Sequence, residues 1–185
     1  MKYFEKKELT KFFKYLKSNC SVRDQAIYNI MYWCGLRVSE LCNMRVDAYN
    51  ESNHTLYCKR SKNGVSNTVQ LDSTRERLVR KYLKQRDMPL EYDPLFISRL
   101  DSHLSRDGIF KMTKKLCKEA KIRELSPHAF RHSIAVHLLD SEVPIYSVKS
   151  HLGHKNISST MEYLAYTTVQ NKALYEKMVN SNMIA

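Results

Sequence analysis

Hydrophobic positions recur every three or four residues along most of the chain, which is the spacing of one helix face. In the first such segment, residues 6–18, they are Leu9, Phe12, Phe13 and Leu16. Serines suited to the N-cap precede three later segments. The pattern predicts further helices between Ser21 and Gly35, at 36–42, at 74–87, after Ser105, from Ser126-Pro127 to Leu139, from Pro144 to Leu152, and at 168–180.

The pattern changes between residues 54 and 71. Two strand-like runs, 54–60 and 65–71, flank the turn Ser61-Lys62-Asn63-Gly64. Asn-Gly between two such runs is a strong hairpin signal. A further short strand is expected at 95–97. We therefore predict a mainly α fold with a small antiparallel β-sheet or hairpin at about residues 54–71, in one domain over residues 1–185.

Charge narrows the range of partners. The formal net charge is +12 and the sequence pI is near 9.5. Such an excess indicates DNA, RNA or an anionic membrane surface, with an inert basic surface as the alternative. No apolar run approaches the ~20 residues of a membrane span. Residues 1–7 lack the apolar core of a signal peptide, so we expect a cytoplasmic protein.

Cysteine spacing argues against structural zinc and against disulfides. The chain has five cysteines, an odd number, and no two of them form a Cys-x-x-Cys pair. We interpret them as reduced and mostly buried small hydrophobic residues.

Six side chains in four separate stretches could cooperate in one site. Arg37 lies two residues after Gly35, and a lysine is expected at the hairpin tip. The helix after Ser126-Pro127 projects a histidine and an arginine from its first turn, where free N–H groups favour an anion. The last stretch places a histidine nine residues before a tyrosine. The six are Arg37, Lys62, His128, Arg131, His154 and Tyr163.

This set suits a metal-free attack on a phosphodiester. A tyrosine with a pKa near 10 is almost entirely protonated at pH 7, so a nearby group must take its proton. Guanidinium groups offer permanently charged, bidentate donors to the oxygens of a pentacoordinate phosphate. Histidines act as acids, bases or donors, and a lysine can protonate the leaving oxygen.

The chain resembles the tyrosine recombinase (phage-integrase) family in its catalytic domain. The matching motifs are Gly35-Leu36-Arg37-Val38-Ser39-Glu40-Leu41, Ser61-Lys62-Asn63-Gly64, His128-Ala129-Phe130-Arg131-His132, and Leu152-Gly153-His154 followed by Tyr163. They occur in the family's order across residues 4–166. Each motif alone is weak, whereas the ordered set is specific.

The resemblance implies a role for each residue. Arg37 and Arg131 would clamp the scissile phosphate. Lys62 would protonate the leaving 5′-oxygen, and Tyr163 would form a 3′-phosphotyrosyl bond. A second tyrosine, Tyr166, is a competing nucleophile, but the nine-residue interval favours Tyr163.

The remaining residues of the motifs would assist. His128 would help proton transfer at the tyrosine, and His154 would hydrogen-bond the phosphate. Glu40 and His132 would support the catalytic residues without contacting the phosphate themselves. The resemblance further implies double-stranded DNA as partner, a monomer in solution that assembles into a tetrameric synapse on DNA, and neither metal nor other cofactor.

Two basic segments, 59–86 and 111–123, are the candidate surface for DNA phosphates. The residues expected to bind DNA there are Lys59, Arg60, Arg75, Lys111, Lys114 and Lys115.

Two departures from the family pattern stand out. We expect no helical DNA-clamping domain of the kind that usually precedes the catalytic one in this family. The chain would then be a compact member, similar to the fimbrial-switch invertases, or an isolated catalytic domain. Glu142 occupies a turn position where the family often has glycine, which puts the geometry of that turn in question.

Three other functions compete with this interpretation. A zinc hydrolase could use His128 and His132, but the motif lacks the glutamate base of His-Glu-x-x-His. A catalytically silent DNA-binding regulator would be expected to have lost the tyrosine or an arginine. A type IB topoisomerase shares the chemistry but is usually much longer. The sequence leaves open the DNA target and the choice among integration, excision, inversion and resolution.

Overall fold

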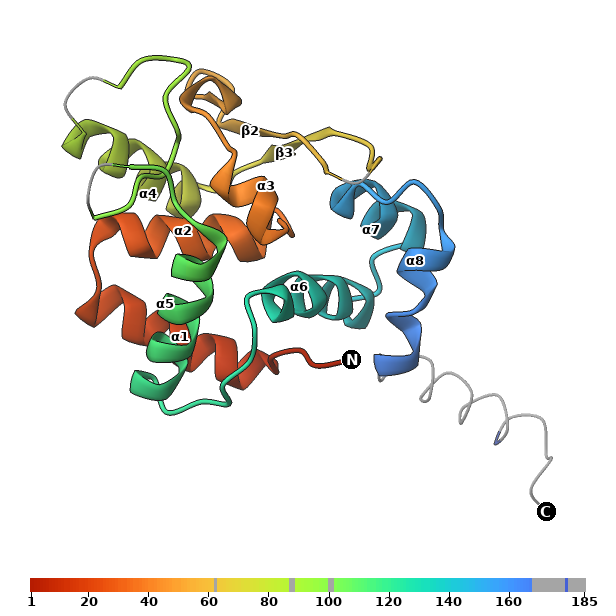
Figure 1. Cartoon of the computed structure of the whole chain (residues 1–185). Coiled ribbons are helices and arrows are strands. Elements are labelled where there is room, and N and C mark those ends of the chain that lie inside the picture. Colours follow the sequence, from red (N-terminus) through yellow and green to blue (C-terminus); the bar gives the residue numbers. More distant parts are fainter. Residues whose placement is uncertain (62, 87–88, 100–101, 168–178, 180–185) are drawn as a thin grey trace.

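The structure is a computed structural model that describes residues 1–61, 63–86, 89–99, 102–167 and 179. Helices make up most of it, and a small sheet lies along one side (Figure 1). The helices are α1 (Lys6–Asn19), α2 (Val22–Trp33), α3 (Val38–Cys42), α4 (Ser73–Gln85), α5 (Arg106–Glu119), α6 (His128–Asp140), α7 (Ile145–Leu152) and α8 (Ser158–Met161), with the 3₁₀ helices η1 (Val46–Ala48) and η2 (Leu164–Tyr166).

The helix starts follow the N-cap residues. The side chains of Ser21 and Ser105 accept hydrogen bonds from the backbone N–H groups of Asp24 and Gly108, which satisfies donors that the first helical turn leaves free. The helices predicted up to residue 152 are confirmed with small shifts of their ends. The helix predicted at 168–180 lies outside the described residues, apart from Val179.

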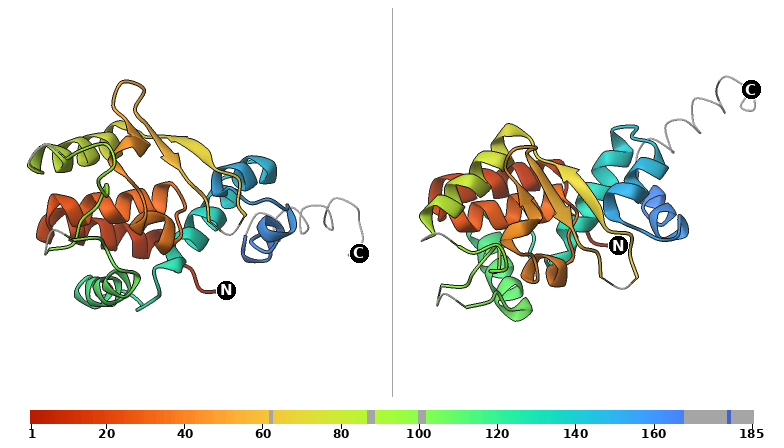
Figure 2. Two further views of the ribbon diagram at one scale, coloured as in Figure 1. Left: turned by 45° about the horizontal axis from the view of Figure 1, so that its top comes forward. Right: turned by 90° about the horizontal axis from the view of Figure 1, so that it is seen from above.

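The sheet contains the predicted hairpin and one further strand. Strands β1 (Tyr49–Asn50), β2 (Thr55–Cys58) and β3 (Asn67–Gln70) pair antiparallel in the order β1-β2-β3. Figure 2 shows the β2–β3 hairpin reaching toward α7. The two-residue β1 is too short to leave a sequence signal. The prediction of a strand at 95–97 was wrong. This segment forms isolated bridges only, and Pro94 offers no N–H to extend a ladder.

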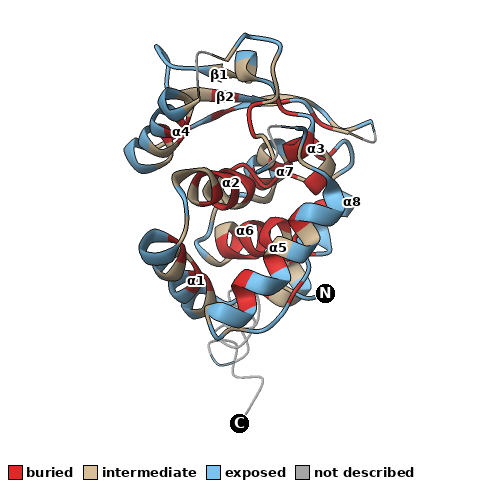
Figure 3. Cartoon of the chain, turned by 60° about the vertical axis from the view of Figure 1, so that its left-hand side comes forward, coloured by how far each residue is buried: buried red, intermediate tan, exposed pale blue. Residues whose placement is uncertain are grey.

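Two hydrophobic clusters meet along α6. The larger one contains Phe130, whose ring lies 4.9–5.4 Å from the rings of Phe4, Phe12 and Tyr28. The smaller one joins the second half of α6 to α7 and includes Tyr163. The red segments in Figure 3 show that α2 and α6 are the most buried helices. Because Phe130 is anchored in the core, the next residue, Arg131, has a fixed direction.

Two left-handed glycines bring the ends of α2 and α7 together. Gly35 has φ +57°, and a Cβ atom there would lie 2.6 Å from Leu152 Cδ2. Gly153 has φ +65°, and its Cβ would lie 2.5 Å from the carbonyl oxygen of Val65. Any other residue would strain the backbone and collide with its neighbour. Arg37 and His154 follow these two turns directly in the sequence.

The five cysteines are free and four of them are buried, as expected. Among the helices that the structure describes, none is both long and apolar enough to cross a membrane.

The turn after α6 forms with a glutamate in the left-handed region, since Glu142 has φ +61°. In this conformation a non-glycine residue lowers the stability of the fold by roughly 1–2 kcal/mol. Glycine avoids this strain but loses more conformational entropy on folding, which offsets about 0.5–1 kcal/mol of the gain. We expect Glu142→Gly to raise the free energy of unfolding by about 0.5–1 kcal/mol, measured by urea titration. The control is Ser141→Gly, at φ −93°, which should destabilise the protein. Equal destabilisation by both variants would contradict the strain at Glu142.

Candidate active site

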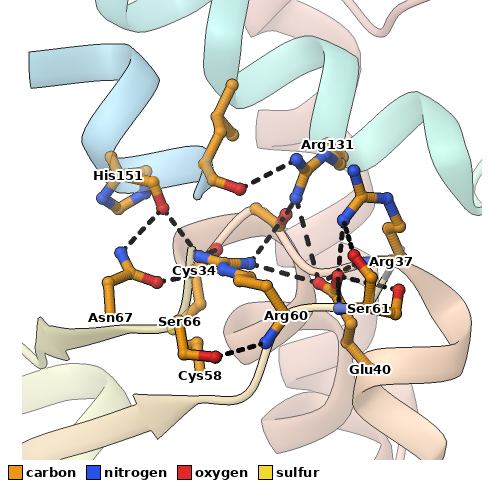
Figure 4. A network of polar contacts seen from close by, with 12 residues as sticks. Cys34, Arg37, Glu40, Cys58, Arg60, Ser61, Ser66, Asn67, Arg131 and His151 are labelled. Atoms are coloured by element: carbon orange, nitrogen blue, oxygen red, sulfur yellow. Dashed lines mark hydrogen bonds and ion pairs between the residues drawn. The ribbon is translucent and has the colours of Figure 1, made fainter. Parts of the chain in front are cut away.

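The buried carboxylate of Glu40 is the centre of a polar network between α2, α3, α6, α7 and the hairpin (Figure 4). Its side chain is 1% exposed. Oε1 accepts hydrogen bonds from Arg37 Nη1 at 2.6 Å and from the backbone N–H and hydroxyl of Ser61. Oε2 accepts from the Arg37 N–H at 3.0 Å and from Arg60 Nη1 at 3.2 Å. Burial alone would raise the pKa of Glu40, but these donors lower it to about 2.

Arg131 lies beside Arg37 and is held by two backbone carbonyls. Its Nη1 donates to the oxygen of Gly35, and its Nη2 donates to the oxygen of Leu152 at 2.8 Å. Burial, followed by the charge of Arg37, lowers the pKa of Arg131 to about 10, so the residue stays charged at neutral pH. The two glycine turns therefore orient one arginine, and Glu40 orients the other.

The hydroxyl of Tyr163 lies 3.3 Å from Nδ1 of His132. Tyr163 is 4% exposed, and burial raises its pKa, while Arg131 and Arg37 act in the opposite direction. Burial lowers the pKa of His132 to about 4, so this imidazole is neutral at pH 7, and a neutral imidazole has one unprotonated ring nitrogen. His128 is exposed, with its ring 6.4 Å from that of His132. His132, which was expected only to support the site, is therefore the histidine that contacts the Tyr163 hydroxyl.

His154 stacks on Tyr163, with the ring planes 6° apart and the ring centres 6.2 Å apart. Its Nδ1 is 2.8 Å from the hydroxyl of the fully buried Thr160. Burial, then the charge of Arg131, lowers the pKa of His154 to about 4. Sequence reasoning missed Thr160, although its position six residues after His154 on a short helix is a usable signal.

The competing tyrosine has a different neighbour. The hydroxyl of Tyr166 accepts a hydrogen bond from the amino group of Met1 at 2.6 Å. Tyr3 packs edge-on against its ring.

Lys62 lies outside the described residues. The residues around it are tied to the site, because Ser61 donates to Glu40 and the N–H of Val65 donates to the oxygen of Gly153 at 3.0 Å. The hairpin therefore contacts both Glu40 and the turn that precedes His154.

The residues expected to bind DNA fall into two groups. The lysines Lys59, Lys111, Lys114 and Lys115 are exposed. Lys59 also lines a groove of 730 Å³ that includes Glu40, Ser61 and Arg45. Arg75 is part-buried, pairs with Asp72 and stacks on Trp33 at 4.3 Å.

Arg60 does not have the surface position that a DNA contact requires. Its side chain is 0% exposed and bonds to Glu40 and to three backbone carbonyls. The alternation of strand β2 explains the difference, since Cys58 and Arg60 point inward while Tyr57 and Lys59 point outward. Extending that period of two past the strand end would have found Arg60 from the sequence.

The zinc alternative lacks ligands in the part of the chain that the structure describes. No group of three His, Cys, Asp or Glu residues there could hold a metal ion.

Comparison with known proteins identifies relatives over most of the chain. The profile of the Phage integrase family matches residues 2–169. Tyrosine recombinase XerD of Oceanobacillus iheyensis is 32% identical over 167 residues, which are 87% of this chain and 56% of XerD. Tyrosine recombinase XerA of Pyrococcus horikoshii is 32% identical over 85% of this chain and 55% of XerA. The chain thus spans about half the length of these relatives.

Solved structures share the fold. A crystal structure of XerA recombinase superposes with a TM-score of 0.78 at 25% identity, over 97% of this chain and 63% of that one. XerH site-specific recombinase, bound to a palindromic difH substrate after cleavage, gives a TM-score of 0.81 at 21% identity. That match covers 94% of this chain and 52% of XerH.

The acid sensitivity of the structure should reflect Glu40. Its folded pKa, about 2, lies below the ordinary value of 4.5. The stability that the ionised carboxylate provides is therefore complete above about pH 4.5 and is lost as the pH falls toward 2. We expect the stability difference between the wild type and Glu40→Gln to shrink by about 2 kcal/mol from pH 6 to pH 3, measured by urea unfolding.

The control for this prediction is Glu91→Gln, which replaces an exposed carboxylate. Its difference from the wild type should change little with pH. A pH-independent difference for Glu40→Gln would contradict the low pKa of Glu40.

Proposed function

The chain belongs to the phage integrase family, and we propose from this premise that it cleaves and rejoins DNA at specific sites through a 3′-phosphotyrosine bond at Tyr163. One observation carries the proposal. The Tyr163 hydroxyl, next to a neutral histidine, lies within the electrostatic influence of two arginines that share one carboxylate network. A nucleophile, a proton acceptor and an anion clamp are thus combined.

The arginines would hold the phosphate as its charge develops. A guanidinium has five N–H donors. The hydrogen bonds of the site use one guanidinium nitrogen of Arg37 and two of Arg131, so both side chains retain donors for non-bridging oxygens. Because their positions are fixed before DNA binds, little reorganisation is needed in the transition state. Removing one such donor typically slows a reaction about 10²–10³-fold.

Proton transfer would begin at His132. As the Tyr163 oxygen bonds to phosphorus, its proton passes to Nδ1 of His132, with His128 as the next group outward. The bond from phosphorus to the 5′-oxygen breaks, and that oxygen takes a proton from Lys62. Rejoining reverses these steps with a new 5′-hydroxyl, and the phosphotyrosine bond conserves the energy. The reaction uses neither metal nor nucleotide.

His154 would donate a hydrogen bond to the phosphate through Nε2. That requires the Thr160 hydroxyl to donate to Nδ1, which leaves the proton of the neutral ring on Nε2. Thr160 would then select the tautomer. The depressed pKa of His154 is consistent with a neutral ring at pH 7.

The partners follow from this chemistry. We propose double-stranded DNA as substrate, a monomer in solution and a tetrameric synapse on two DNA sites. Because DNA is the substrate, the proposed location is the cytoplasm. XerH recombinase, which shares the fold, is bound to its difH substrate in the solved structure, and this supports the choice of DNA.

The first test is the nucleophile. Tyr163→Phe should abolish the covalent protein–DNA adduct on a nicked suicide substrate because it removes the attacking oxygen. The adduct is measured by denaturing gel electrophoresis in excess EDTA. Tyr166→Phe is the matched control and should still form adduct. Adduct formation by Tyr163→Phe, or a reaction that EDTA inhibits, would overturn the proposal. If the wild type forms the adduct and relaxes plasmids but does not recombine them, the protein is a topoisomerase.

The second test is the DNA surface. Each phosphate contact contributes about 0.9 to the slope of log affinity against log salt. Replacing Lys59, Lys111, Lys114 and Lys115 by glutamine should therefore lower the slope by roughly 3–4 units, as measured by fluorescence anisotropy. The control removes the same charge from α1 at the exposed Lys7, Lys11, Lys14 and Lys17. Equal losses in the two variants would mean that the four chosen lysines are not a special surface.

A further inference from the structure

We propose that Arg60 is a positioning residue for strand cleavage, which fixes Glu40 and the two turns that orient the catalytic arginines. The inference rests on the proposed function for its catalytic consequence. Its structural part stands on the contacts of Arg60 alone.

Every N–H donor of the Arg60 guanidinium has a partner. Nε donates to Asn67 Oδ1 at 2.9 Å. Nη1 donates to Glu40 Oε2 at 3.2 Å and to the Gly35 oxygen at 3.4 Å. Nη2 donates to the Cys34 oxygen at 3.0 Å and to the His151 oxygen at 2.6 Å. Five bonds match the five donors of a guanidinium, so none remains for a DNA phosphate.

These acceptors belong to segments that are far apart in the sequence. Cys34 and Gly35 end α2, Glu40 lies in α3, and His151 lies in the last turn of α7. Asn67 opens β3, and its side chain also donates to the oxygen of His151 at 3.0 Å. Figure 4 shows the guanidinium of Arg60 between the strand ends, α7 and Glu40. One side chain therefore joins the hairpin to three other elements.

Each bond restrains a group of the candidate active site. By binding Oε2 of Glu40, Arg60 leaves Oε1 for Arg37 and Ser61. The Gly35 oxygen that accepts from Arg60 also accepts from Arg131. The same turn begins the segment that carries Arg37. Movement of this oxygen or of Glu40 would displace both arginines of the clamp.

Lysine cannot reproduce this arrangement. Its ammonium has three donors at a single point, whereas the acceptors of Arg60 surround a planar group. Arg60→Lys keeps the charge, but its three donors cannot replace all five hydrogen bonds of the guanidinium. A catalytic group displaced by about 1 Å can slow a reaction by roughly 10²-fold.

The experiment compares Arg60→Lys with Arg23→Lys. Arg23 is a matched control, since it is part-buried, pairs with Asp24 at 2.7 Å and donates to the Ile97 oxygen, remote from Glu40. At saturating suicide substrate, we expect the single-turnover rate of adduct formation to fall about 10²-fold in Arg60→Lys. Arg23→Lys should keep the rate of the wild type. DNA affinity and its salt slope should stay the same in both variants.

A wild-type rate in folded Arg60→Lys would overturn the inference. So would a reduced salt slope with an unchanged rate at saturation, because that result marks a DNA contact. If Arg60→Lys does not fold, Asn67→Ala serves instead. It removes the partner of Nε and should slow cleavage several-fold at unchanged DNA affinity, and a wild-type rate there would overturn the inference.

A measurement without DNA separates this inference from the proposed function. The N–H groups of Ser61 and Val65 donate to Glu40 and to Gly153, respectively, and report how the hairpin is held. Their hydrogen exchange should be faster in Arg60→Lys, or in Asn67→Ala, than in Arg23→Lys. If the wild type forms no adduct, the proposed function fails, and this exchange still decides the role of Arg60. Equal exchange in these variants would overturn it.

Discussion

The structure depends on one buried carboxylate that several cationic groups share. Glu40 is nearly inaccessible to water, and an isolated charge in such a place would be costly. Arg37, Arg60 and the Ser61 N–H compensate that cost, and Arg131 lies 3.9 Å away. Because removing one partner from a buried ion pair typically costs about 3–5 kcal/mol, the arrangement constrains all of these residues at once.

The backbone completes what the carboxylate begins. Carbonyl oxygens at the ends of α2 and α7 hold Arg131, and the left-handed glycines there allow the two ends to approach. Three arginines, Arg37, Arg60 and Arg131, surround the single carboxylate of Glu40, so the site keeps a net positive charge. Such a preorganised cationic site binds an anion without first rearranging, which is the requirement for stabilising a phosphoryl transition state.

The sequence predicted the local structure of each segment, but it did not predict which residues of different segments contact each other. The hairpin signal and the N-cap residues identified local elements correctly. The alternation of β2 separates the buried Arg60 from the exposed Lys59, but the acceptors of Arg60 lie in other segments, and no local pattern identifies them. His132 was expected to lie further from the reacting groups, but it lies against the Tyr163 hydroxyl, because η2 packs onto α6.

The sequence by itself predicted the helices up to residue 152, the hairpin, a set of candidate residues and the family resemblance, because these depend on short-range spacing and residue type. Only the tertiary structure decided which donor faces which acceptor. The partners of Arg60 come from α2, α3, β3 and α7, and the His154 ring is fixed by Thr160 and Tyr163. Burial and hydrogen bonding depend on segments brought together by the whole core, and no local pattern encodes that convergence.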